Sequence, residues 1–350
     1  MRQVGIDYVT IGDVLARTIF SSDGKVLLGH GVVLSAGFIT RLRDLGITAI
    51  YIQDERLADI RVVDLISERT RREAMQALKM TTDMIKNGRQ FDGMRMKKSV
   101  SSVVEEVASS REVLINLIDI RSKENWLMSH SLSVSVLATV LGMNCGLEQK
   151  RLVELAMGAM LHDVGVTALP AGLLAKDEAL YDAAEVTKYR EHVPEGFNLL
   201  RRQLEVPLMS AHVAYQHHEN VDGSGYPRGL KGHEIHLYGR IVAVADVYDR
   251  LVNKGRKRVL PHEACEILMG LTGRYLDQEL VTMFLKSVAT YPTGISVRLS
   301  TGEIGVVVGQ NASLPMRPIV RVLEERRRVI DPKEYNLMKD MTLFITEVLQ

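Results

Sequence analysis

The sequence is poor in the features that mark secreted and membrane-spanning chains. It has two cysteines in 350 residues, Cys145 and Cys265, and each stands alone among hydrophobic residues. Buried reduced thiols are expected, rather than a disulfide or a metal site. No stretch approaches the roughly 18–20 consecutive apolar residues that cross a bilayer, and the first residues lack the basic start and apolar run of a signal peptide. We therefore expect a cytoplasmic protein with no membrane span.

An excess of charge of one sign is also lacking, with 44 Lys and Arg against 43 Asp and Glu. Such a balance gives no global field that would attract a nucleic acid polymer or an anionic membrane. Any phosphate must then be bound locally, by a few placed cations or metals. The hydrophobic fraction of 46% is ordinary for a soluble globular protein. A chain of this length can form more than one domain.

Hydrophobic periodicity divides the chain into four segments. These are a small α+β module over residues 1–60, a helical connector over 61–120, a helical domain over 121–290 and a β-rich module over 291–350. The expected fold class is therefore mostly α, with an all-α helical bundle between two small flanking modules. The apolar faces of the connector could pack within the chain or pair two copies, so a homodimer through this segment stays open.

Local signals place several element ends. A short helix over residues 36–45 is expected to end at Gly46, and the first connector helix at Asn87-Gly88. Ser101 or Ser102 is a possible N-cap for the second connector helix. In the last segment, a turn at residues 301–302 separates two strand patterns, and the arginine run 326–328 is expected in a solvated turn.

Residues with metal-binding side chains gather in the helical domain. His162-Asp163 ends one apolar helix and offers a neutral nitrogen and a carboxylate able to bridge two cations. His130 lies on an apolar helix and taken alone would be a core histidine. His192 precedes a proline typical of a first helical turn, where its side chain can reach a cleft. None of these signals is specific by itself.

A paired histidine followed by a glycine-rich loop is the most specific pattern. His217-His218 ends a helix, and the sequence then reads Asp-Gly-Ser-Gly-Tyr-Pro over residues 222–227. The glycines allow the backbone to turn sharply and to approach a ligand closely. This arrangement is hard to explain as core packing.

Two carboxylates complete the pattern. Asp246 and Asp249 are three residues apart, hence on one face of a helix that is otherwise apolar. A buried carboxylate is costly unless a cation compensates it, which a metal would do. Asp249 could then orient or deprotonate a metal-bound water.

The candidate ligands are too many for one metal. They comprise five imidazoles and two carboxylates, His130, His162, His192, His217, His218, Asp163 and Asp246. A set of seven suggests two divalent metals that share a bridging carboxylate. Nitrogen and oxygen ligands without sulfur suit Fe or Mn, with Zn or Ni as alternatives. Two such metals are suited to hydrolysis of a phosphodiester.

These residues resemble the HD-GYP family of HD-domain phosphohydrolases, above all in the string HHENVDGSGYP over residues 217–227. The resemblance implies an HD-type helical fold and the seven ligands above, with Asp163 bridging. It also implies hydrolysis of cyclic di-GMP to linear pGpG or GMP in bacterial signalling. Gly225, Tyr226 and Pro227 would lie beside the substrate.

Three departures from the family pattern bear on activity. Val166 stands where a phosphate-contacting lysine is usual, and Trp126 where some members have an acidic ligand for a third metal, which favours two metals. Gly255 stands where an arginine is usual, and the adjacent Arg256 and Arg258 are candidate replacements in the substrate clamp. These departures motivate an alternative function, a weakly active or inactive cyclic di-GMP receptor that signals through its flanking modules. A hydrolase acting on another phosphate ester is a further alternative.

Overall fold

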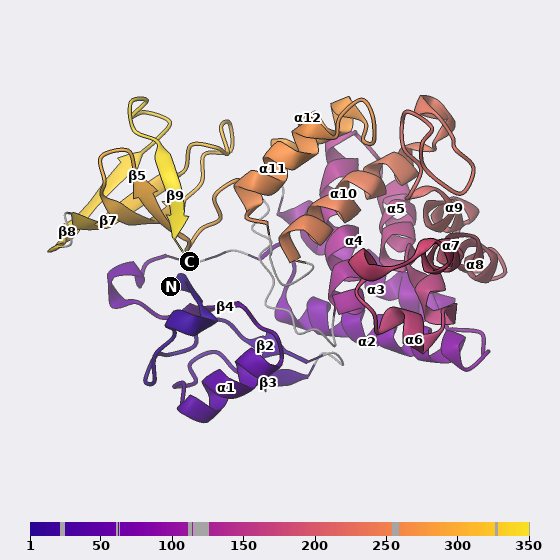
Figure 1. Ribbon diagram of the computed structural model, residues 1–350, viewed down its shortest axis with the longest axis horizontal. Helices are drawn as coiled ribbons and strands as arrows, with labels where there is room; N and C mark the ends of the chain where they lie inside the picture. Colours follow the sequence, from indigo (N-terminus) through magenta and orange to yellow (C-terminus); the bar gives the residue numbers. More distant parts are fainter. Residues whose placement is uncertain are drawn as a thin grey trace.

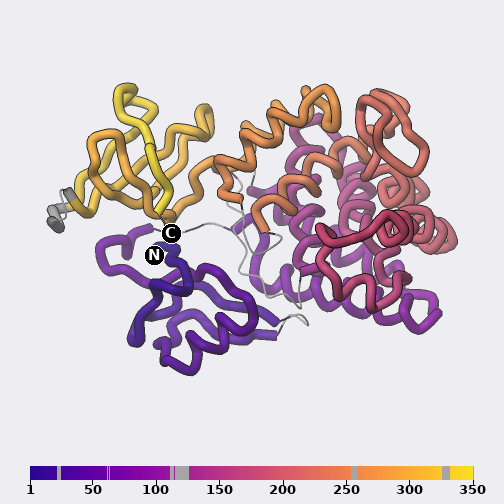
Figure 2. Tube along the Cα trace, viewed as in Figure 1, coloured from indigo at the N-terminus to yellow at the C-terminus, as the bar shows by residue number. Residues whose placement is uncertain are grey.

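The computed structural model contains a helical bundle with two small modules beside it (Figure 1). The structure describes residues 1–21, 25–60, 62, 64–110, 114, 126–253, 259–325 and 328–349. The trace in Figure 2 shows both small modules on the same side of the bundle, with the two chain ends close together between them.

The N-terminal module pairs short strands beside a single helix. β1 (Arg2–Gly5) runs antiparallel to β4 (Ala49–Ile52), and β2 (Ile19–Phe20) pairs with β3 (Val26–Leu28). The expected helix is α1 (Ala36–Asp44). Gly46 follows it with a left-handed φ of 77°. The predicted helix and its terminating glycine are therefore confirmed.

The connector consists of two helices whose apolar faces are covered within the chain. α2 (Glu68–Lys86) and α3 (Gly93–Ser109) contact each other and the helical bundle. Side chains such as Met75 and Val103 are buried in the same hydrophobic core as the bundle. The surface that suggested a homodimer is thus already used for packing inside one chain.

The ends of the connector helices differ in how well the sequence predicts them. α2 ends at Lys86 with Asn87 as its C-cap, and Gly88 follows with a φ of 67°, so the predicted stop at Asn87-Gly88 is confirmed. The N-cap expected at Ser101 or Ser102 is wrong, because both serines lie inside α3. Asp92 caps the helix instead, and its carboxylate accepts a hydrogen bond from the backbone N–H three residues later at 2.9 Å.

The bundle is built from helices of 4 to 19 residues around the central α4. Its helices are α4 (Trp126–Asn144), α5 (Gln149–Leu161), α6 (Ala171–Leu174), α7 (Ala183–Arg190), α8 (His192–Leu200), α9 (Leu208–Gln216), α10 (Leu237–Asn253), α11 (Pro261–Gly270) and α12 (Gln278–Leu285). Among the described residues, three 3-10 turns lie between them, η4 (Val164–Ala168), η5 (Glu178–Leu180) and η6 (Gly232–Glu234). The core formed by α4, α5, α9 and α10 fixes the helix ends that carry the metal-binding side chains.

The central helix α4 is apolar on all sides because it is surrounded by protein. Among the described helices it alone has the length and composition to cross a membrane, but 67% of its apolar window is buried inside the molecule. α5 and α10 pack against it, and His130 in its first half is fully buried. We therefore assign α4 as the core helix of the bundle.

The C-terminal module is one antiparallel sheet of five strands in the order β8-β7-β6-β5-β9. The strands are β5 (Ser296–Leu299), β6 (Ile304–Gly309), β7 (Ile319–Glu325), β8 (Arg328–Asn336) and β9 (Ile345–Leu349). The turn expected at residues 301–302 joins β5 to β6, and Gly302 has a left-handed φ of 85°. Residues 326 and 327 of the arginine run lie outside the described residues.

The two small modules contact each other directly. The backbone N–H of Gln3 donates to the carbonyl of Gly294 at 2.8 Å. Arg321 on β7 donates to both carboxylate oxygens of Asp59, at 2.7 and 2.6 Å. Leu57 is buried with apolar side chains of β6 and β7. The beginning and the end of the chain are therefore packed into one body beside the bundle.

Candidate metal centre

Five helices and their ends bring all seven predicted ligands to one place. His130 comes from α4, and His162 and Asp163 from the end of α5; His192 comes from the start of α8, His217 and His218 from the end of α9, and Asp246 from α10. Six of these side chains are buried, with exposed fractions of 0–3%, and His218 is partly buried. Their convergence at the centre of the bundle leaves little room for solvent.

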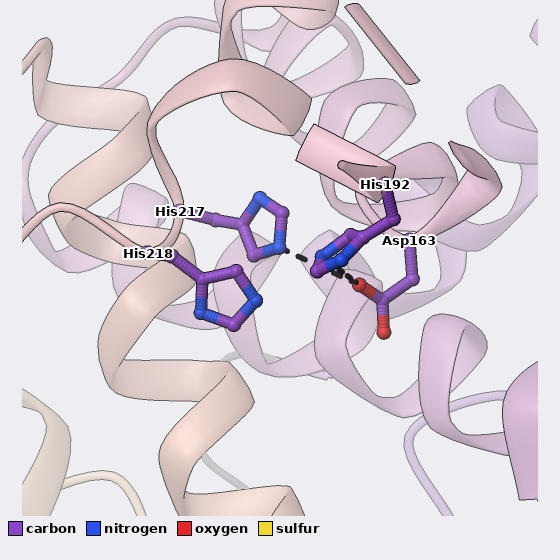
Figure 3. A group of neighbouring side chains, drawn as sticks. All are labelled: Asp163, His192, His217 and His218. Carbon is purple, nitrogen blue, oxygen red and sulfur yellow. Dashed lines mark ion pairs between the residues drawn. The ribbon is translucent and has the colours of Figure 1, made fainter. Parts of the chain in front are cut away.

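The seven side chains form two groups that could each hold a cation. One group contains Asp163, His192, His217 and His218, and Figure 3 shows these side chains pointing toward one another. The other contains His130, His162 and Asp246. Within each group, the ligand atoms lie within 4.8 Å of one another. We refer to them as the four-ligand group and the three-ligand group.

Asp163 lies between the two groups and faces both. Its Oδ1 atom is 3.5 Å from Nε2 of His192 and 3.4 Å from Nε2 of His217. Its Oδ2 atom is 3.4 Å from Nε2 of His162 in the other group. One carboxylate thus presents a separate oxygen to each group, which is the arrangement that a bridging ligand requires.

Hydrogen bonds at the far side of the imidazole rings turn their Nε2 atoms inward. Nδ1 of His162 donates to the carbonyl of Ala159 at 2.7 Å, and Nδ1 of His192 to the carbonyl of Tyr189 at 2.6 Å. His217 makes the same contact with the carbonyl three residues before it, at 3.1 Å. Because a carbonyl oxygen can only accept, Nδ1 carries the proton of each neutral ring and Nε2 keeps its lone pair for a metal.

Asp249 orients His130 in a similar way. Its Oδ2 atom lies 2.7 Å from Nδ1 of His130, and its Oδ1 atom accepts a hydrogen bond from Asn253 at 3.0 Å. The side chain is fully buried. Both carboxylate oxygens therefore contact protein groups on the side of His130 that points away from the other ligands. The sequence placed Asp249 correctly on the face of Asp246 but not in this contact.

Several buried ligand atoms have no well-aligned hydrogen-bond partner among the described residues. They are Nε2 of His130, His162, His192, His217 and His218, and Oδ1 of Asp163. Leaving a buried polar atom without a partner costs about 1–3 kcal/mol. Six such atoms converge on one place, and their imidazole and carboxylate chemistry fits divalent metal ions as the missing partners.

Arg250 also enters the centre, and sequence reasoning missed it. Its Nε donates to Oδ1 of Asp246 at 2.7 Å, and its Nη2 donates to Oδ2 of Asp163 at 3.1 Å. The available signal was its position four residues after Asp246 on α10, because side chains with this spacing lie on the same helical face.

Burial disfavours charge at the centre, so the direction of each pKa depends on whether burial or the neighbouring charges dominate. Burial lowers the pKa of His192 to about 4, which keeps its imidazole neutral at pH 7. Burial acts the same way on His162, but Asp163 and Asp246 outweigh it and raise the pKa of His162 to about 10. Despite burial, the charges of His162 and Arg250 hold the pKa of Asp163 well below its usual range. The carboxylates at the centre are therefore ionised and attract cations.

The glycine-rich loop lies against the four-ligand group. The ring of Tyr226 stacks on His218 with a centroid separation of 4.8 Å, and the guanidinium of Arg190 lies 4.7 Å from the Tyr226 ring centroid. Gly225 is required sterically, because a Cβ there would lie 2.3 Å from the backbone nitrogen of Asn220. The loop thus places Gly225, Tyr226 and Pro227 beside the centre. Arg256 and Arg258, the other predicted substrate contacts, lie outside the described residues.

Glu219 anchors the backbone of this glycine-rich loop. Its carboxylate is buried and accepts hydrogen bonds from the backbone N–H groups of Arg228 at 2.8 Å and Leu230 at 2.9 Å. A buried carboxylate with two backbone donors is a strong anchor, because each charge-assisted hydrogen bond contributes about 1.5–3 kcal/mol.

Replacing Glu219 by glutamine should therefore loosen the loop. The amide group would point its own N–H toward one of the two backbone donors, and we expect a loss of about 1.5–3 kcal/mol in unfolding free energy. Chemical denaturation measures this loss. Glu234→Gln is the matched control, because the exposed Glu234 accepts one backbone hydrogen bond from Lys231 in the same segment. An equal loss in both variants would contradict the anchoring role of Glu219.

Comparison with known families identifies the class of protein that this fold and centre define. Residues 112–280 match the HD domain family model, and residues 296–350 match that of a KOW domain associated with HD domains. The solved structure of an HDG"Y"P protein from Bdellovibrio bacteriovorus superposes with a TM-score of 0.53 at 17% sequence identity, covering 81% of this chain and 97% of that one. This likeness supports the fold alone. The helical domain is an HD domain.

Proteins with similar sequences indicate which group of HD-domain proteins this chain resembles. The chain is 31% identical over 233 residues to a cyclic di-GMP phosphodiesterase of Pseudomonas aeruginosa, covering 65% of this chain and 56% of the relative. It is 35% identical over 178 residues to a cyclic di-GMP phosphodiesterase of Thermotoga maritima (50% and 48%), and 32% identical over 198 residues to 3'3'-cGAMP-specific phosphodiesterase 2 of Vibrio cholerae (54% and 37%). The chain thus spans about half the length, or less, of these relatives. The HD domain match and these relatives support the predicted HD-GYP family, and the structure confirms the predicted mostly helical fold.

Proposed function

We propose that this protein is a metal-dependent phosphodiesterase that hydrolyses cyclic di-GMP to linear pGpG, GMP or both. The observation that carries the proposal is Asp163, which presents one oxygen to each of two adjacent ligand groups. Such a carboxylate suits a pair of divalent cations, and a pair of cations suits displacement at phosphorus. The relatives named as cyclic di-GMP phosphodiesterases support the choice of substrate.

The donor atoms favour Fe or Mn, because imidazoles and carboxylates are present and thiolates are not. Two such cations, when bound, lower the pKa of a bound water and stabilise charge on the phosphate oxygens. The four-ligand group would hold one cation, and the three-ligand group together with Oδ2 of Asp163 would hold the other. This assignment gives each cation four ligand atoms from the protein.

The remaining residues of the centre position ligands and substrate. Asp249 keeps the proton on Nδ1 of His130 and so presents Nε2 of that ring to the metal, in place of the water-directed role expected from sequence. Tyr226 and Gly225 shape the loop beside the four-ligand group: the Tyr226 ring stacks on His218, and Gly225 lets the loop pack closely against the backbone of residues 218–220. Both roles follow from contacts that the loop already makes.

The full chain, reconstituted anaerobically with Mn²⁺ or Fe²⁺ and incubated with cyclic di-GMP, tests the proposal. We expect linear pGpG or GMP to accumulate, as measured by ion-exchange chromatography, and the metal-stripped chain to be inactive. 3'3'-cGAMP serves as the comparison substrate. Tight binding of cyclic di-GMP without any product would favour a receptor, and turnover restricted to other phosphate esters would overturn the choice of substrate.

A further inference from the structure

We propose that Arg250 acts as a resident cation of the three-ligand group, so that this group binds its metal more weakly than the four-ligand group and fills second. The inference rests on the two-metal centre of the proposed function, but it does not depend on which phosphodiester is cleaved. It assigns a role in metal loading to a side chain that is not itself a ligand.

The guanidinium contacts the same oxygen atoms that the three-ligand group offers to a metal. Oδ1 of Asp246, which accepts from Nε of Arg250, also lies 2.8 Å from Nε2 of His130. Oδ2 of Asp163, which accepts from Nη2, also faces Nε2 of His162 at 3.4 Å. Both carboxylates on this side of the centre are thus partly neutralised before any metal binds.

The position of Arg250 is fixed by its surroundings. Its side chain is 17% exposed, and its guanidinium carbon lies 5.6 Å from the ring centroid of Trp126. Trp126 in turn stacks on His130, with a centroid separation of 4.4 Å and an interplanar angle of 15°. A guanidinium stays charged at any physiological pH, so this cation is present in every state of the centre.

The four-ligand group has no comparable neighbour. Its carboxylate atom is Oδ1 of Asp163, and within the described chain no lysine or arginine forms an ion pair with that atom. Three imidazoles complete the group. The four-ligand group therefore offers one more nitrogen ligand than the three-ligand group. A metal that enters the four-ligand group would bind Oδ1 of Asp163, the carboxylate oxygen that Arg250 does not contact.

This asymmetry sets an order of binding. A divalent cation that enters the three-ligand group must share Oδ1 of Asp246 and Oδ2 of Asp163 with the guanidinium of Arg250. The cation must also approach the positive charge of that guanidinium. Losing even one charge-assisted hydrogen bond corresponds to roughly a 10- to 100-fold change in an equilibrium constant. We expect the second metal of the wild-type chain to bind at least about 10-fold more weakly than the first.

Titration of the metal-stripped full chain with Mn²⁺, followed by calorimetry without nucleotide, tests the inference. The wild type should show one tight and one weak site. Arg250→Ala should tighten the weak site about 10-fold or more and change the tight site less, because Arg250 contacts the Asp246 and Asp163 oxygens of the weak site and only the other oxygen of the Asp163 carboxylate that the tight site uses. Arg250→Lys should lie between the two, since it keeps the charge but not the paired donors. Asp246→Asn should abolish the weak site.

Arg240→Ala is the matched control, because Arg240 lies on the same helix and pairs with Asp277 at 2.5 Å outside the centre. It should leave both metal affinities as in the wild type.

Thermal unfolding gives a second measurement. Without metal, Arg250→Ala should melt at a lower temperature than the wild type, and Mn²⁺ should raise the melting temperature of Arg250→Ala by more than it raises that of the wild type. Two equal sites in the wild type, or a weak site unchanged or weaker in Arg250→Ala and Arg250→Lys, would overturn the inference. Two metals bound without turnover of cyclic di-GMP would overturn only the proposed substrate.

Discussion

Replacing Asp163 by alanine is expected to lower metal content and cyclic di-GMP turnover together. Asp163 is 1% exposed and gives one oxygen to each ligand group, so its loss removes a ligand from both cations at once. Substituting a residue that merely orients a metal ligand commonly costs 10- to 100-fold in affinity or activity. We therefore expect more than about a 100-fold loss of turnover and fewer than two metals per chain.

Metal analysis of the purified variant, beside a turnover assay at saturating substrate, measures both effects. Asp249→Asn is the matched comparison, because Asp249 contacts one imidazole rather than a cation. It should keep the metal of the four-ligand group and lose activity within about 10- to 100-fold. An Asp163→Ala chain that retains two metals would contradict the bridging role.

Replacing Gly165 by alanine should disturb the centre without altering any ligand. A Cβ at this position would lie 1.9 Å from the backbone carbonyl oxygen of His192 and 2.6 Å from the backbone nitrogen of Gly196. Both atoms belong to α8, so the clash can be relieved only by moving that helix away from η4. Because His192 begins α8, the shift would displace its Nε2 atom from the four-ligand group.

The expected cost is at the upper end of the range for overpacking, about 3 kcal/mol of unfolding free energy, or roughly 5–10 °C in melting temperature. Gly172→Ala is the matched control, since a Cβ there meets nothing within 4 Å and the residue lies in α6. Thermal unfolding and the affinity for the first Mn²⁺ measure the two effects. Should Gly165→Ala melt and bind metal as Gly172→Ala does, the close approach of η4 to α8 would not constrain the centre.

The convergence of the seven candidate ligands could be predicted from sequence because the chemistry of these side chains leaves few alternatives. An ionised carboxylate such as Asp246 on an apolar helix needs a cation, and a histidine pair before a glycine-rich loop is seldom needed for packing. The glycines at positions 46 and 88 were predictable for a similar reason, since a left-handed φ strongly favours glycine. The glycine signals are local, whereas the set of ligands becomes specific only when the segments that carry them are considered together.

Roles that depend on contacts between distant segments of the chain were harder to predict from the sequence. Asp249 contacts His130, which is 119 positions away, and no local pattern in the sequence indicates this contact. Arg250 reaches Asp163 across 87 positions. The start of α3 was missed for a different reason: serines inside a helix also fit the N-cap pattern, and tertiary packing decides between them.

The meeting of the two chain ends has a consequence for engineering this fold. Leu349 pairs with Ser296 in the terminal sheet, and Gly294 accepts a hydrogen bond from Gln3. A short linker could therefore join the last residue to the first, and new termini could be opened in an exposed loop of the bundle. Such a circularly permuted chain would preserve every helix that carries a metal ligand, while the two small modules would become an insertion within a continuous polypeptide.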